Sequence, residues 1–129
     1  MTLEDAPVAF VRIDHVQLAL PPGEEPRAVA FYAGVLGLTQ VPKPAPLAVR
    51  GGAWFAAGDV VLHLGVEADF RPARKAHPAL VVRGIEALAE RLVVAGYEVR
   101  WDRELPDVVR FHTDDPFGNR LELLEPVRA

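Results

Sequence analysis

The chain contains no cysteine among its 129 residues, which excludes disulfide bonds, thiolate nucleophiles and cysteine-based zinc sites. Long hydrophobic runs are also missing, because the apolar stretches are strand-sized and far below the roughly 18 residues of a membrane span. Residues 1–5 lack the basic and apolar blocks of a signal peptide. We therefore expect no membrane segment and a cytoplasmic location.

Basic charge is scarce as well. The formal net charge is −4, and the one basic run is residues 71–75. Proteins that bind nucleic acid normally present a basic face, so this class is not expected. The length suits one domain spanning residues 1–129, with a small molecule or a second copy of the chain as its partner.

The order of predicted elements occurs twice. The first half predicts a helix over 25–36 among strands at 11–20, 39–42, 47–56 and 59–66; the second predicts a helix over 85–95 among strands at 77–83, 97–103, 107–113 and 120–125. These βαβββ modules, about 11–67 and 76–126, are joined by a polar link over 68–76. Neither module alone buries both faces of a sheet, so we expect them to pack as one α+β domain.

Four residues of metal-ligand type occupy matching places in the two modules. His15 and His77 are 62 positions apart, and His63 and Glu122 are 59 apart. Each lies on one face of a predicted strand whose other face is apolar. An isolated strand histidine is usually a hydrogen-bonded structural residue, and a lone Glu122 would suit a solvated edge. The matched placement instead favours a shared site for a divalent metal.

Other residues are candidates for the walls of a substrate pocket. His112 shares a strand face with Arg110 and is such a candidate, with a surface position as the alternative. Arg50, Trp54 and Trp101 also fall in predicted strands. Aromatic strand residues are often part of the core, which is the alternative for both tryptophans.

Segments 13–16, 31–38 and 115–123 carry a family resemblance. Over nearly all of residues 11–126 the chain resembles the vicinal oxygen chelate superfamily. This superfamily includes glyoxalase I, fosfomycin-resistance proteins, methylmalonyl-CoA epimerase, bleomycin-resistance proteins and extradiol dioxygenases. The resemblance implies that two βαβββ modules form an open, cup-shaped mixed sheet around a divalent metal, with helices outside.

The resemblance also implies the ligand set. Metal ligands in such proteins come from the first and fourth strands of each module, which here carry His15, His63, His77 and Glu122. His15, His77 and Glu122 resemble the two-histidine, one-carboxylate set of the dioxygenase and fosfomycin-resistance branches. His63 departs from the carboxylate or amide usual in glyoxalase I and the epimerase, which argues against a strict glyoxalase I assignment.

The expected function is a metal-dependent enzyme that acts on a small substrate with neighbouring oxygens, by lyase or isomerase chemistry. Catalysis would involve His63 and Glu122, and the metal would be Zn, Ni, Mn, Co or Fe(II). The alternatives are an Fe(II) extradiol-type dioxygenase and a ligand-binding or antibiotic-resistance protein that sequesters its ligand. We expect a homodimer, because an open cup leaves sheet edges exposed, and the link over 68–76 permits sites shared between two chains.

Overall fold

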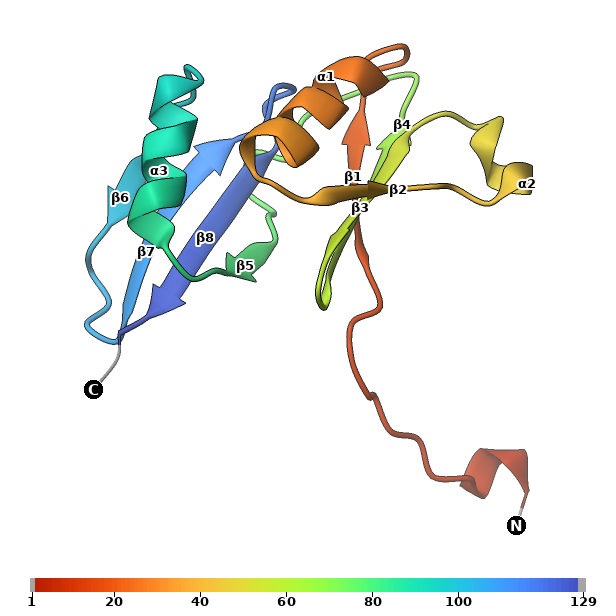
Figure 1. Cartoon of the computed structure of the whole chain (residues 1–129). Helices are drawn as coiled ribbons and strands as arrows, with labels where there is room; N and C mark the ends of the chain where they lie inside the picture. Colours follow the sequence, from red (N-terminus) through yellow and green to blue (C-terminus); the bar gives the residue numbers. More distant parts are fainter. Residues whose placement is uncertain (1, 128–129) are drawn as a thin grey trace.

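The computed structural model describes residues 2–127 and repeats one order of elements in its two halves (Figure 1). A short 3₁₀ turn, Leu3–Asp5, precedes the first half. That half contains β1 (Val16–Leu20), α1 (Glu25–Val29), the π-helical η2 (Ala30–Val35), β2 (Thr39–Val41), α2 (Ala45–Ala48), β3 (Ala53–Ala57) and β4 (Val60–Val66). The second half contains β5 (Ala79–Val81), α3 (Ile85–Val94), β6 (Arg100–Asp102), β7 (Val108–Asp114) and β8 (Arg120–Pro126).

Each half forms one four-stranded mixed sheet, in the orders β1-β4-β3-β2 and β5-β8-β7-β6. β1 runs parallel to β4, and β5 runs parallel to β8. The remaining neighbouring strands are antiparallel. The same pairing in both sheets confirms the predicted α+β class and the repeated βαβββ module. The helices pack on one face of each sheet, and the opposite, helix-free face is called its outer face below.

One apolar core spans both halves. Alternate strand residues such as Leu62 and Leu123 pack with helix residues such as Phe31 and Leu92 in a single cluster. Polar contacts also join the halves: the Tyr32 hydroxyl donates to Asp115, and the Asn119 amide donates to the carbonyl of Ala19. Since the odd residues of β1 and the even residues of β8 point away from this core, they are free to build a site.

The structure corrects several predicted boundaries; residues 77–78 and 97–99, for example, lie outside β5 and β6. Residues 47–50 are not strand: α2 covers 45–48, and Val49 and Arg50 form a turn, because Pro44 and Pro46 interrupt any ladder and suit the first turn of a helix. Residues 11–15 lie outside β1: the ladder between β1 and β4 starts at Val16 and Leu62, although β4 itself begins two residues earlier, at Val60. These residues instead lead away from the body of the molecule (Figure 1).

Within residues 2–127, no helix has both the length and the apolar character needed to cross a bilayer.

Candidate metal centre

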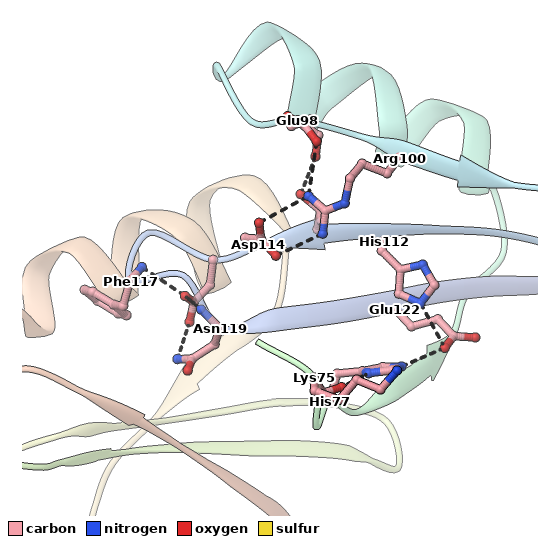
Figure 2. A network of polar contacts seen from close by, with 11 residues as sticks. Lys75, His77, Glu98, Arg100, His112, Asp114, Phe117, Asn119 and Glu122 are labelled. Atoms are coloured by element: carbon pink, nitrogen blue, oxygen red, sulfur yellow. Dashed lines mark hydrogen bonds and ion pairs between the residues drawn. The ribbon is translucent and has the colours of Figure 1, made fainter. Parts of the chain in front are cut away.

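Three side chains of metal-ligand type meet on the outer face of the second sheet (Figure 2). Glu122 on β8 lies directly across the ladder from His112 on β7, and His77 precedes β5. The Glu122 carboxylate is 2.9 Å from Nε2 of His77 and 3.4 Å from Nε2 of His112. One ligand atom from each residue lies within 4.8 Å of the other two. Two imidazoles and one carboxylate therefore converge within one module.

A backbone contact orients the His77 ring. Its Nδ1 lies 2.8 Å from the carbonyl oxygen of Lys75, so this nitrogen carries a proton and donates it. A neutral ring then has only a lone pair on Nε2, which faces the Glu122 oxygen, another acceptor. The two acceptors can approach to 2.9 Å only with a proton or a cation between them. This arrangement, with the second ring nitrogen held by a carbonyl, is the usual one for metal-bound histidine.

The surroundings favour the charged form of Glu122. Burial of this side chain opposes ionisation, but the contact with His77 and the positive charge of Arg110 outweigh it. The pKa of Glu122 therefore lies below its ordinary value. Nη1 of Arg110 is 3.4 Å from Glu122, while Nη2 is 2.8 Å from Asp102. The carboxylate is thus an anion that can bind a cation, and Arg110 is held in place beside it.

His112 is kept neutral by its environment. Burial is the main cause that lowers the pKa of His112, the charge of Glu122 opposes it, and His77, Arg120 and Arg110 lower it further. A neutral imidazole has a lone pair available for a metal or for a proton.

The two separations between Glu122 and the histidines are close to those between ligands of one metal ion. Donor atoms bound at about 2.1 Å and at angles of 90–110° lie roughly 3.0–3.4 Å apart. The observed separations of 2.9 and 3.4 Å bracket this range. The donor set suits Zn, Ni, Mn, Co or Fe(II) and does not choose among them.

The other two predicted ligands lie at the first sheet: His63 on β4, and His15 directly before β1. The rings of His15 and His63 stack with centroids 4.0 Å apart, and Trp54 stacks on the opposite side of His63, also at 4.0 Å. Neither histidine belongs to the group around Glu122 found among residues 2–127. His15 and His77 nevertheless line one groove between β1, β4 and β5. The single chain thus divides the four predicted ligands into two clusters.

The surroundings of His63 also favour its neutral form. Burial lowers the pKa of His63, and the neighbouring His15 lowers it further, while Asp14 acts in the opposite direction. Nδ1 of His15 is 2.9 Å from Asp14. His15 is the more exposed of the two, with 40% of its side chain accessible, and its position at the start of β1 leaves it open to another molecule.

Two predicted pocket residues lie away from both clusters. Trp101 packs edge-on against the buried Phe111 on the helix-covered face of the sheet, opposite to His112. Arg50 is exposed on the turn after α2. Sequence reasoning gave no role to Arg110 and treated His112 only as a substrate contact. The turn over 114–119 could have indicated His112, because that hairpin pairs position 112 with position 122; Arg110 lies two residues before His112 on the same face of β7.

Comparisons with known proteins agree with this architecture. A model of the glyoxalase-like domain matches residues 17–124. The chain is 45% identical to a protein from Bacillus anthracis assigned to the glyoxalase family; the match covers 95% of this chain and 100% of that one, with a TM-score of 0.91. No curated protein sequence matches.

More distant structures share the fold alone. A fosfomycin-resistance protein from Listeria monocytogenes is 11% identical. The match covers 92% of this chain and 96% of that one, with a TM-score of 0.73. An antibiotic-binding protein from a Streptomyces species is 23% identical. The match covers 92% of this chain and 100% of that one, with a TM-score of 0.69. The fold defines a protein of the vicinal oxygen chelate superfamily. Within it, the chain belongs to the glyoxalase-like domain family.

Proposed function

We propose that this protein is a divalent-metal-dependent enzyme that acts on a small substrate with neighbouring oxygens, by lyase or isomerase chemistry of the glyoxalase type. The observation that carries the proposal is the contact between His77 and Glu122. The Lys75 carbonyl orients His77 so that its Nε2 lies 2.9 Å from the ionised Glu122 carboxylate, a separation that requires a proton or a cation between the two atoms. Such a pair is arranged to hold a cation.

Each residue of the site has a distinct task. His77 and Glu122 would hold the metal, and His112 would complete the set or take a proton from the substrate at Nε2. Arg110 holds Glu122 in its ionised form and in its orientation. When bound, the metal would act as a Lewis acid toward two adjacent substrate oxygens. His63, neutral because of burial and His15, is the proposed base in the first-sheet cluster.

We further propose a homodimer in which His15 and His63 of one chain face His77 and Glu122 of the other. The separation of the two clusters within one chain supports this arrangement. So does the N-terminal arm (residues 6–15), whose exposed fractions are 81% at Val8, 99% at Phe10, 87% at Val11 and 75% at Ile13. A monomeric protein rarely exposes so contiguous an apolar segment.

Metal analysis tests the enzyme proposal. Protein purified without chelator or nickel resin should contain about one divalent metal per chain. Glu122→Gln should lose most of it, because the variant removes the only anion of the set, and His112→Gln should lose less. Glu90→Gln, the same change at an exposed site on α3, should retain it. Equal metal content in the Glu122 and His112 variants would show that the wrong residues were chosen.

Mixing variants tests the shared site. A His15→Ala chain and a Glu122→Ala chain should each bind metal poorly. If sites are shared, a mixed dimer contains one site with both His15 and Glu122 intact, and part of the metal binding returns. Within-chain sites would recover none.

Oxygen uptake separates the alternative enzyme class. An Fe(II)-loaded dioxygenase would consume oxygen with a catechol-like substrate, whereas the lyase or isomerase proposed here would consume none. A sequestering protein would bind its ligand and return it unchanged.

A further inference from the structure

A hollow lined by arginines lies beside the candidate metal centre. Its walls are Arg74, Arg100, Asp114, Gly118 and Arg120. Arg120 and Glu122 alternate on the same face of β8, and residues two apart in a strand are about 7 Å apart. The hollow therefore opens on the outer face of the second sheet, next to the carboxylate proposed to hold the metal.

One of the three arginines is already paired. Arg100 makes two contacts with the Asp114 carboxylate, at 3.1 and 3.0 Å, and a third with Glu98 at 3.3 Å (Figure 2). These contacts raise the pKa of Arg100. Although Asp114 lies directly across the ladder from Arg120, its oxygens are turned to Arg100.

Arg120 and Arg74 are left without a counter-charge. Over the described range, 2–127, neither guanidinium takes part in an ion pair. Nε of Arg120 is buried and has no hydrogen-bond partner in that range. A buried donor without a partner is costly, so a ligand that accepts its hydrogen bond would be favoured.

The backbone holds Arg74 in this position. The link over 68–76 is fastened to the start of β8 by two hydrogen bonds: Arg120 N donates to the Ala73 carbonyl at 2.8 Å, and Ala73 N donates to the Asn119 side chain at 3.0 Å. Arg74 is thus delivered by a segment whose path is set, rather than by a free loop. Two guanidinium groups at one hollow suit an oxyanion, which they bind through charge-assisted hydrogen bonds.

We propose that Arg74 and Arg120 form a subsite for an anionic group of the substrate, a carboxylate or a phosphate-type oxyanion. The proposal rests on the proposed function for the other end of the substrate: the neighbouring oxygens lie at His77 and Glu122 while the anionic group lies in the hollow. The substrate class is thus a small acid that carries a vicinal-oxygen unit and a separate anionic end.

The first test uses inorganic phosphate and metal-free full-length protein, so it does not depend on the metal. Calorimetry should show saturable binding that weakens about tenfold in Arg120→Gln and in Arg74→Gln, the effect of losing one hydrogen bond to a charged group. Arg120→Lys should keep part of the affinity, and Arg91→Gln, at an exposed site on α3, should keep all of it. No saturable binding to the wild type, or equal affinities in all variants, would overturn the subsite. Because Arg74 is exposed, its variant answers the question even if Arg120→Gln fails to fold.

The second test joins the subsite to the metal centre. Acetohydroxamate and succinohydroxamate chelate metal alike, but only the second carries a carboxylate. With manganese-loaded protein, succinohydroxamate should bind about tenfold more tightly, and Arg74→Gln should abolish this difference without changing the affinity for acetohydroxamate. Phosphate binding without hydroxamate binding would refute the metal function and leave the subsite standing. Equal affinity of wild-type protein for the two hydroxamates would refute the placement of the anionic end in the hollow.

Discussion

At the scale of single residues, hydrogen bonds and ion pairs between charged side chains organise the outer face of the second sheet. Glu122 accepts from His77 and Arg110, and Arg110 is in turn held by Asp102. Asp114 accepts two hydrogen bonds from Arg100, so its carboxylate is not turned to Arg120. The pairing of these side chains therefore decides which charged groups on this face can bind a ligand.

Tyr32 offers a test of one buried hydrogen bond. Its hydroxyl donates to Asp115 at 2.7 Å, and burial together with the charge of Asp115 raises the pKa of Tyr32 well above its ordinary value of 10.0. Tyr32→Phe should lower the free energy of unfolding by about 1–3 kcal/mol at neutral pH, because Asp115 loses a buried donor. Chemical denaturation measures this change.

The same variant has a pH signature. Above pH 10 the unfolded wild type releases the Tyr32 proton while the folded protein retains it, so the stability of the wild type falls as pH rises. The difference between wild type and Tyr32→Phe should therefore shrink above pH 10. Tyr97→Phe is the control, since the Tyr97 hydroxyl makes no side-chain hydrogen bond in the region 2–127. Equal losses in both variants would contradict the account.

His63 should titrate below the ordinary histidine value of 6.5, because burial and the adjacent His15 favour its neutral form. Nuclear magnetic resonance of the ring protons, in metal-free protein, would give this midpoint. His15→Gln should move the midpoint upward by removing one of the two causes. Since the folded pKa is depressed, the unfolded chain takes up the proton first, and His63 reduces stability as pH falls below 6.5. A midpoint above 6.5 would contradict the prediction.

At the scale of elements, tight backbone approaches position the strands that carry the first-sheet cluster. Gly52 precedes β3 with φ +85°, and its N–H donates to Glu25 at 2.9 Å. A Cβ at this position would overlap the carbonyl oxygen of Leu64 on β4. The close approach brings Trp54 opposite His63 in the ladder.

Gly52→Ala should therefore destabilise the protein by about 3 kcal/mol or more, through overlap added to the strain of positive φ. Gly23→Ala is the matched control: Gly23 also has positive φ, +79°, but a Cβ there meets nothing within 4 Å. The control should lose only about 1–2 kcal/mol. Thermal and chemical denaturation would compare the two, and equal losses would show that the overlap is relieved at little cost.

At the scale of the whole molecule, the exposed N-terminal arm and the open sheet edges support the proposed homodimer. A homodimer should have a mass near 28 kDa by light scattering at micromolar concentration, twice the 14.1 kDa of one chain. Phe10→Ser should shift the equilibrium toward monomer, because Phe10 is 99% exposed in the single chain. Val49→Ser, at another exposed apolar residue, should not. A wild-type mass near 14 kDa would refute the dimer.

The sequence by itself determined the repeated module, because alternation along strands and apolar spacing along helices are local properties that survive without knowledge of the partner strands. It also determined which face of β8 carries Glu122, and it named His77 and Glu122, which the structure brings together. Local patterns could not place the ends of β1 or the helix at 45–48, since the start of β1 depends on where its ladder with β4 begins, at Val16 and Leu62.

Only the tertiary structure decided which residues meet. His112 joins Glu122 because a hairpin aligns them, whereas His15 and His63 stack with Trp54 on a different sheet. Spacing along the chain marks residues of the same kind, but distance in space depends on the register of two strands and on the packing of two sheets. The arginine hollow follows the same rule, because it exists only where the link over 68–76 is fastened to the start of β8.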